Sequence, residues 1–344
     1  MTFRDKLPFI IITVIILFCT TYLLSEKTPF NGDEFYTLDI NKIHKPIPYK
    51  FILAKYIERF EAISSTHIFH LRITSIFFTI IGIILCFITF AQGRNEAIIL
   101  ALLLITNSFI NAISIFFRYY SFYFFTSMLT FIFLTQWVKH FSTNKKLLFS
   151  FAGMIISPFV LYVLNTLQFV FYFFYMLLFE KIKRLRLRLA FIIIISVMFI
   201  GITLNPWIIW DFMKFLNISG HGAINAASEN IHGFTKSSFI KPVYAVYQMF
   251  FGHDVAPTFS VANSIFFIMI SIFLLHQLFW IFIEDRKLFL DYLFILVIPF
   301  LTIYLFFEVL STPGFTQLET IHGMFLYPLL IVLIVKAPKY VSSL

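Results

Sequence analysis

The sequence predicts an all-α protein that crosses a membrane many times. Hydrophobic residues make up 60% of the 344 residues, and charged residues only 12%. A water-soluble domain of this length could not cover its surface with so few polar side chains. Long apolar runs recur along the whole chain, and about 20 apolar residues is the length of a membrane-spanning helix. These observations indicate a polytopic (multi-pass) helical membrane protein.

Ten apolar segments approach the length of a span, and together they make residues 1–344 a single transmembrane domain. The first segment follows basic residues, as in a signal peptide, but it has no small-residue cleavage site, so we expect it to remain as a helix. The breaks are least marked between the third and fourth segments and between the fifth and sixth, where Asn165 and Thr166 interrupt the run. We expect transmembrane helices at about 7–24, 67–91, 97–113, 119–138, 147–164, 167–180, 189–206, 259–283, 288–309 and 321–335.

The lysines and arginines orient the chain. Most of them lie in short segments on the side that holds the N-terminus, and the positive-inside rule places that side in the cytoplasm. We therefore expect an integral protein of the cytoplasmic (inner) membrane. The basic run 181–188 is interpreted as a topology anchor beside anionic membrane lipids, so no nucleic acid is expected as a partner. Fifteen of the 26 Lys and Arg fall on this side: Arg4, Lys6, Arg94, Lys139, Lys145, Lys146, Lys181, Lys183, Arg184, Arg186, Arg188, Arg286, Lys287, Lys336 and Lys339.

Two long loops then fall on the outer, periplasmic face, at about 25–66 and about 207–258, with a short third loop at 311–320. The first is expected to be partly helical, with an amphipathic helix at 48–62 that lies in the membrane interface. We expect a catalytic cavity where these loops meet the outer leaflet. The interfacial helix is predicted from the spacing of Phe51, Ile52, Lys55, Tyr56 and Arg59.

Two adjacent carboxylates, Asp33 and Glu34, follow the first apolar segment almost at once. A charged pair close to lipid is costly to maintain, so it needs an explanation. In one, Asn31 or Asp33 caps a short interfacial helix and Glu34 interacts with the helix dipole. In the other, Asp33 is a general base that faces a site at the lipid–water boundary. These residues alone leave both interpretations open.

Several kinds of chemistry have no motif in this sequence. It contains no phosphate-binding loop, dinucleotide fingerprint, His-Glu-x-x-His or Gly-x-Ser-x-Gly, so nucleotide-driven chemistry is not expected. The two cysteines, Cys19 and Cys86, lie in apolar runs and are expected to pack there. The histidines His221, His232 and His322 form no ligand spacing. We therefore assign no metal-binding residue, and a divalent metal held through folding remains open.

Five blocks in order resemble the GT-C glycosyltransferases, most of all the bacterial and archaeal relatives of the dolichyl-phosphate-mannose-protein mannosyltransferases. The resemblance covers most of the chain and follows the same order of helices and outer loops. One departure is His322-Gly323, where that family often has an Arg-Tyr pair. The blocks are Asn31–Thr37 (Asp-Glu-aromatic), His44–Tyr49 (His-Pro-Pro-Leu-Tyr), His70–Ser75 (Leu-Arg-Leu-Pro-Ser), Phe117–Ser121 (Ala-Arg-x-Tyr-Ser) and the segment from Tyr244 to Pro257.

The resemblance implies sugar transfer from a polyprenyl-phosphate-linked donor to a lipid, glycan or protein acceptor on the outer face. Asp33 is then the general base, and Glu34 holds the acceptor or Asp33, or only caps a helix. Arg118 is the best cation for the leaving phosphate, with Tyr119 as a hydrogen-bond donor. We assign no cofactor to this reaction and leave a divalent metal open. The other candidate substrate-binding residues are His44, Tyr49, Lys50 and His253.

Two functions from other classes stay open. A lipid or polysaccharide transporter or flippase would need polar groups along a path through the bilayer, and Asp291 and Glu308 fall near helix ends instead. A non-catalytic subunit of an envelope-assembly complex would need no such path. Arg118 could also simply end a helix, with its guanidinium reaching the interface. For Arg72 we expect a structural role, paired with a loop carboxylate such as Glu58 or Glu61.

Overall fold

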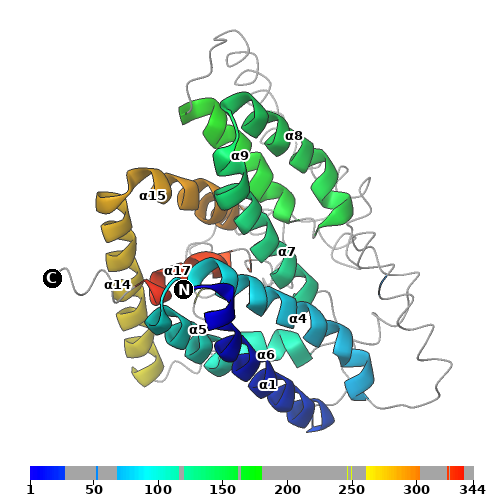
Figure 1. Ribbon diagram of the computed structural model, residues 1–344. Helices are drawn as coiled ribbons and strands as arrows, with labels where there is room; N and C mark the ends of the chain where they lie inside the picture. Colours follow the sequence, from blue (N-terminus) through cyan, green and yellow to red (C-terminus); the bar gives the residue numbers. More distant parts are fainter. Residues whose placement is uncertain are drawn as a thin grey trace, which may run out of the picture.

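The described part of the chain is helical throughout. The computed structural model describes residues 1–27, 52, 68–115, 120–161, 164–179, 246, 249, 261–302, 324 and 326–336. Within these ranges there are helices and short connections between them, and no β-strand (Figure 1). The predicted all-α fold class is confirmed for this part of the protein.

The helices follow the apolar runs of the sequence. Two of them pass into a turn of π-helix, at Phe133–Trp137 after α7 and at Leu293–Val297 after α15, and a 3₁₀ turn at Val138–His140 ends the first of these. The helices are α1 (Phe3–Lys27), α4 (Ile68–Phe90), α5 (Arg94–Thr106), α6 (Ser108–Ile115), α7 (Tyr120–Ile132), α8 (Thr143–Val160), α9 (Asn165–Phe179), α14 (Val261–Glu284), α15 (Arg286–Tyr292) and α17 (Tyr327–Val335).

Several of these helices have the length and composition of membrane spans. Three qualify outright, Phe3–Leu24, Arg72–Phe90 and Tyr120–His140, and a bent pair makes a fourth if it counts as one span. Every expected span overlaps a described helix except 189–206, which lies outside the described residues. The described part therefore has the apolar helices of a membrane protein, and a count of ten spans remains a prediction.

The expected helix at 97–113 is wrong, because the structure divides it into α5 and α6. The two helices meet at Asn107 with a bend of 57°. Asn107 has an extended backbone, with ψ of 110°, which cannot continue α5. Its side-chain Oδ1 accepts a hydrogen bond from the Ile110 N–H at 3.0 Å, so it caps the start of α6. A break between the fifth and sixth expected helices is confirmed, but it lies earlier than expected: α8 ends at Val160, and Asn165 and Thr166 are the first residues of α9.

Parallel packing of α4 and α7 forms the centre of the bundle. Phe78 of α4 contacts Phe122 of α7, with ring centroids 5.1 Å apart, and three turns further on Phe90 contacts Phe131 at 5.8 Å. The contacts advance along both helices together, so the two helices run in the same direction. A Cβ on Gly82 would overlap the ring of Phe124, so the glycine allows this close approach.

Helices α8 and α9 form an antiparallel hairpin beside α7. Phe133, in the π-turn after α7, contacts Phe169 of α9. The ring of Phe169 lies so close to Gly153 of α8 that a Cβ there would overlap it. α9 runs parallel to α7 and ends against the π-turn Leu293–Val297 that follows α15, where Tyr175 and Phe294 have ring centroids 5.4 Å apart. The C-terminal ends of α4, α7 and α9 therefore face the same side of the molecule (Figure 1).

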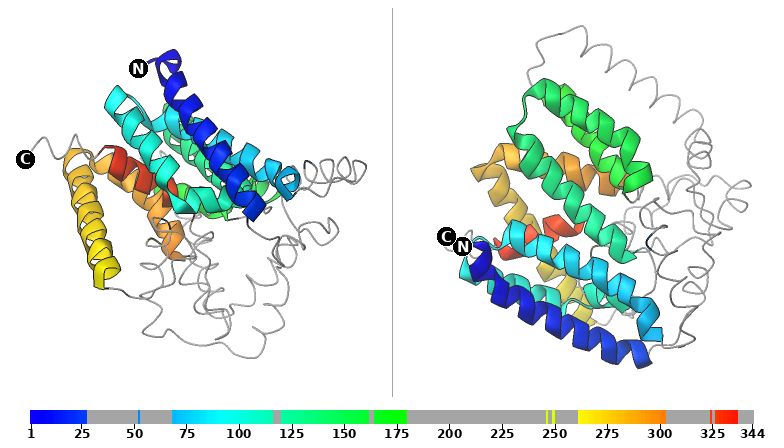
Figure 2. Two further views of the ribbon diagram at one scale, coloured as in Figure 1. Left: turned by 90° about the horizontal axis from the view of Figure 1, so that it is seen from below. Right: turned by 45° about the vertical axis from the view of Figure 1, so that its right-hand side comes forward.

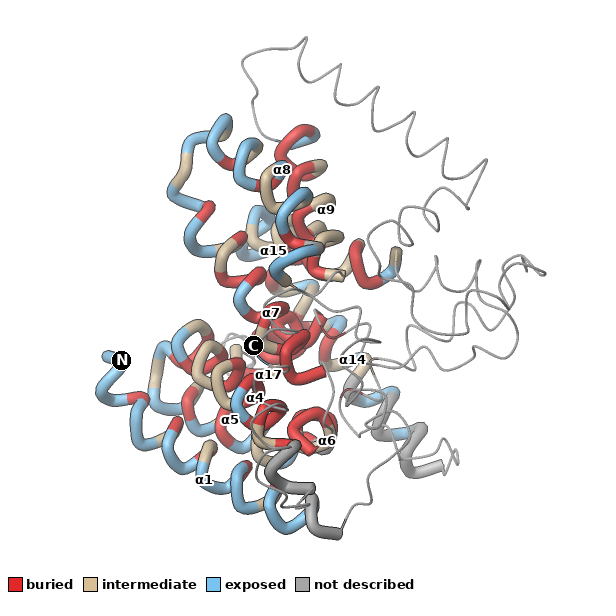
Figure 3. The backbone as a smooth tube through the Cα atoms, turned by 90° about the vertical axis from the view of Figure 1, so that its right-hand side faces the viewer, coloured by how far each residue is buried: buried red, intermediate tan, exposed pale blue. Residues whose placement is uncertain are grey.

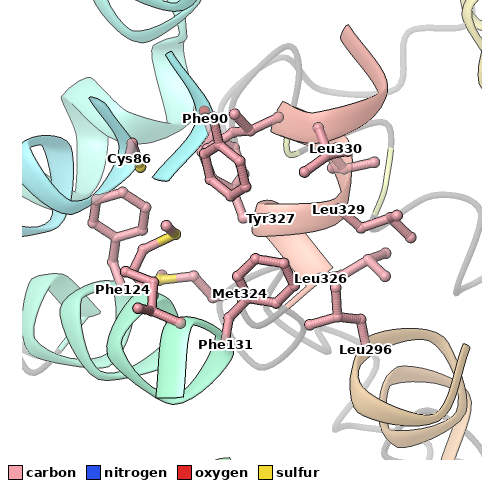
Figure 4. Close-up of a cluster of buried hydrophobic side chains, with 14 of the residues drawn as sticks. Cys86, Phe90, Phe124, Phe131, Leu296, Met324, Leu326, Tyr327, Leu329 and Leu330 are labelled. Carbon is pink, nitrogen blue, oxygen red and sulfur yellow. The ribbon is translucent and has the colours of Figure 1, made fainter. Parts of the chain in front are cut away.

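The core is centred on α17 and its neighbours, and α1 lies at the edge. Tyr327 at the start of α17 packs against Phe109 and Phe124, beside Cys86 (Figure 4). α17 lies between α5 and α14 (Figure 2). Most of α1 is exposed (Figure 3), and its exposed residues are largely apolar, as a lipid-facing surface requires. Cys86 is buried as expected, whereas Cys19 lies on the exposed side of α1, so packing in the core is wrong for it.

Three of the basic segments meet at one end of the bundle, which we call the basic end. The N-terminal amino group donates to the Gln92 carbonyl at 3.1 Å. Lys6 Nζ donates to the carbonyl of Phe87 at 3.2 Å, and Lys336 pairs with Glu96 at 2.7 Å. The start of α1, the turn between α4 and α5, and the end of α17 are thus joined here. The opposite end, where α1 and α6 end and α4, α7 and α9 begin, we call the loop end.

Candidate active site

The residues that the sequence assigns to the site lie outside the described residues. What the structure describes is the set of helix ends from which their segments leave. The chain that carries Asp33 leaves from α1, and the segment with Arg118 connects α6 to α7. The residues concerned are Asp33, Glu34, His44, Tyr49, Lys50, Arg118, Tyr119 and His253.

Helix α6 joins the first two of these segments. Thr21 Oγ1 of α1 and Ser114 Oγ of α6 form a buried hydrogen bond of 2.9 Å, although they are 93 residues apart in sequence. Ser114 also donates to the Asn111 carbonyl at 2.7 Å, which fixes its hydroxyl on the helix. This buried pair therefore holds the helix that leads to Asp33 against the helix that leads to Arg118.

The cap of α6 joins the third segment. Asn107 Nδ2 donates to the backbone carbonyl of Met249 at 2.9 Å, across 142 residues of sequence. Met249 is fully buried, and His253 follows it by four residues. An Asn side chain offers both a donor and an acceptor. Asn107 therefore caps α6 with its oxygen and binds the distant backbone at Met249 with its nitrogen. Both ends of α6 thus bind chain that leads to a candidate site residue.

Chain length limits how far these residues lie from the frame. Asp33 is six residues beyond the end of α1, and an extended chain of that length spans about 20 Å at most. Arg118 is three residues beyond α6, with a reach of about 10 Å. His253 is within about 14 Å of Met249 by the same measure. These limits allow the three residues to share one site at the loop end.

The start of α7 is buried immediately after Arg118 and Tyr119. Tyr120 is 5% exposed and Ser121 is fully buried. A charged side chain beside such a buried helix is costly unless it reaches water or an anionic partner. Arg72 near the start of α4 is itself fully buried and engaged in interactions, while Glu58 and Glu61, its expected partners, lie outside the described residues.

Sequence reasoning missed the small polar residues that hold the frame. Thr21 and Asn107 lie inside the expected helices and Ser114 lies just beyond one, and their one signal is that they are polar residues inside or beside apolar segments. Within the described residues, no three His, Cys, Asp or Glu side chains gather as metal ligands. A divalent metal therefore has no assigned ligand in this part of the chain.

Comparison with models of known protein families, with curated proteins and with solved structures finds no match.

Proposed function

We propose that the protein is a membrane glycosyltransferase that transfers a sugar from a polyprenyl-phosphate donor to an acceptor at the outer face of the cytoplasmic membrane. The observation that carries this proposal is the pair of buried hydrogen bonds on α6. They hold together the helices and backbone that lead to Asp33, to Arg118 and Tyr119, and to His253. The motif order in the sequence assigns the same three segments to one site.

The chemistry follows from the residue types. Asp33 takes the proton of the acceptor hydroxyl while its oxygen forms a bond to the anomeric carbon. The bond from that carbon to the phosphate oxygen breaks, and the polyprenyl phosphate leaves with the electron pair. Arg118 balances the charge that develops on the phosphate, and Tyr119 donates a hydrogen bond to it. Glu34 holds the acceptor, and the sugar and phosphate contact His44, Tyr49, Lys50 and His253.

In this proposal the chain crosses the membrane ten times, with the N-terminus in the cytoplasm. The meeting of three basic segments at one end supports a single basic face of the bundle. The positive-inside rule assigns such a face to the cytoplasm. The loop end, with the candidate site, then faces the outer leaflet, where lipid-linked sugars and their acceptors meet.

The test is transfer by the purified protein from a panel of radiolabelled polyprenyl-phosphate sugars to a lipid extract. Asp33→Asn should lower turnover by about 10² to 10⁴, the usual contribution of a general base. The matched control is Asp5→Asn, because Asp5 is an exposed carboxylate at the basic end that accepts its described hydrogen bonds from Thr2, three residues before it. Full transfer by Asp33→Asn, or no transfer from any donor by the wild type, contradicts the proposal.

A further inference from the structure

A row of buried polar side chains runs along one face of α9. Asn165 and Gln168 are fully buried, and Tyr172 and Tyr175 are each 3% exposed. Their spacing of three, four and three residues places all four on the same side of the helix. The row therefore extends from the loop end, where α9 begins, toward the basic end, where it meets α15.

Polar residues of α7 face the part of this row near the start of α9. The Thr126 hydroxyl donates to Asn165 Oδ1 at 2.8 Å, and Asn165 Nδ2 donates to Ser127 Oγ at 3.1 Å. Asn165 Nδ2 also donates to Gln168 Oε1 at 2.9 Å. Thr130 lies one turn beyond Thr126 on the same face and is 1% exposed. Hydroxyls and amides thus line both sides of the contact between two apolar helices.

Two atoms in the middle of this contact have no hydrogen-bond partner among the described residues: Gln168 Nε2 and Thr130 Oγ1. An unpaired buried polar group costs about 1–3 kcal/mol. Buried polar atoms in such a position ordinarily bind an internal water, which makes about three hydrogen bonds. The two atoms therefore mark places for water between α7 and α9.

At the C-terminal end of α9 the row reaches a carboxylate that faces the basic end. The Tyr175 hydroxyl donates a hydrogen bond to the half-buried carboxylate of Asp291 on α15. Lys146 of α8 and Lys287 of α15 act on this carboxylate as cations, and Asp285 as a second anion. Lys287 and Asp285 are exposed, so this group connects with water at the basic end.

We propose that the row formed by Thr126, Ser127, Thr130, Asn165, Gln168, Tyr172, Tyr175 and Asp291, the polar seam, holds a file of water and moves protons between the basic end and the start of α9. A proton from water binds the Asp291 carboxylate. The Tyr175 hydroxyl then turns from Asp291 to the next water and gives its own proton to that water as its oxygen accepts the proton of Asp291. The Thr130 hydroxyl relays in the same way. The Nε2 group of Gln168 orients a water molecule, and Asn165, which is bonded directly to Gln168 Oε1, holds that amide in place.

The seam differs from ordinary polar contacts between membrane helices. Such contacts stabilise a helix pair through satisfied hydrogen bonds and small residues. Here a titratable group closes one end, unpaired donors occupy the middle, and hydroxyls that both donate and accept lie between. The π-turns Phe133–Trp137 and Leu293–Val297 begin within three residues of Thr130 and Asp291, and single π-turns occur often at functional sites.

The experiment measures proton flux into liposomes that contain the purified protein and a trapped pH-sensitive dye, driven by a potassium diffusion potential. The wild type should acidify the lumen faster than protein-free liposomes. Thr130→Val should slow this by about threefold or more, because one relay link is lost. Asp291→Asn should slow it by about tenfold or more, because a positioned carboxylate contributes at least that to proton transfer.

The control variant is Thr13→Val. Thr13 is also fully buried, but its hydroxyl donates to the Phe9 carbonyl within α1, away from the seam. It should retain wild-type flux, and each variant is first checked for wild-type thermal unfolding. The proton path is overturned if the wild type gives the same proton flux as protein-free liposomes, or if Thr130→Val gives the same proton flux as Thr13→Val. If Asp291→Asn does not fold, the near-isosteric Thr130→Val still decides. Sugar transfer is measured separately, so a transferase without proton flux refutes the seam alone.

Discussion

The two ends of the bundle are held together by different chemistry. At the basic end the contacts involve charged groups: Lys336 with Glu96, and Lys6 with backbone carbonyls at the end of α4. At the loop end two neutral hydrogen bonds join distant segments, between Thr21 and Ser114 and from Asn107 to a carbonyl, while the charged Arg72 is fully buried nearby in α4. Both ends join segments far apart in sequence, so both fix the fold.

Access to water explains the difference. The side chains of Lys336 and Glu96 keep 19% and 23% of their surface exposed, so their charges remain partly solvated. The bond between Thr21 and Ser114 is buried, and a charge there would lose its hydration without repayment. In the proposed site, Asp33 and Arg118 are the charged groups next to these two neutral hydrogen bonds. The comparison predicts that arginines at the two ends are not equivalent.

The largest expected effect separates the ends by function. Arg118→Gln should lower sugar transfer by about 10² or more, because the leaving phosphate loses its cation. Arg94→Gln, the matched change at the basic end, should leave transfer unchanged, since Arg94 is an exposed side chain in the first turn of α5. The measurement is initial rate at saturating donor. Equal loss in both variants would mean that the arginine at the loop end has no special role.

The next effect concerns the cap that joins α6 to Met249. Asn107→Leu removes the N-cap and leaves the Met249 carbonyl without its donor, and should destabilise the protein by about 2–3 kcal/mol. Unfolding in mixed detergent micelles measures this change.

Asn95→Leu provides the control, because Asn95 lies on the exposed side of α5. It should change the free energy of unfolding by about 0.5 kcal/mol at most. If Asn107→Leu is equally mild, the bend of α5 and α6 does not depend on the Asn107 side chain, and the loop end is held by other contacts.

A smaller effect is expected from the hydrogen bond between α1 and α6. A double-mutant cycle with Thr21→Val and Ser114→Ala should give a coupling energy of about 0.6–1.7 kcal/mol, the range for polar pairs between membrane helices. If this pair also positions the site, each single variant lowers transfer as well as stability. A coupling near zero would remove the link between the helices that lead to Asp33 and Arg118.

The sequence predicted the helices well because their cause is local. A run such as 76–90 consists almost wholly of apolar residues, and that alone specifies a buried or lipid-facing helix. The bend at Asn107 escaped prediction because one Asn inside an apolar run is compatible with a straight helix. The Asn107 side chain at the bend also binds the carbonyl of Met249, 142 residues away, a contact that no local pattern indicates.

The faces of the helices and the polar seam were also beyond the sequence. Cys19 and Cys86 have similarly apolar neighbours, yet one is exposed and the other buried, since α1 lies at the edge of the bundle and α4 in its centre. The polar residues of α7 and α9 form a continuous row only because those helices pack in parallel, and the sequence does not show which helices are neighbours. The roles of Asp33, Arg118 and the other candidate site residues stay predictions, because they rest on motif order and on the frame of α6.

The smallest expected effect belongs to the ion pair of the basic end. Glu96 accepts hydrogen bonds from the N–H groups of Gln92 and Gly93 at 2.6 and 3.1 Å, and its other oxygen pairs with Lys336. Glu96→Gln keeps an acceptor for the backbone but loses the charge, so it should destabilise by less than about 1 kcal/mol. Raising the salt to about 1 M, where the screening length falls to about 3 Å, should make the free energies of unfolding of wild type and variant equal.

The destabilisation by Asn107→Leu should not change with salt, because neither of the partners of Asn107 is charged. A salt-independent loss of several kcal/mol in Glu96→Gln would show that the basic end, like the loop end, is held by contacts that water does not reach.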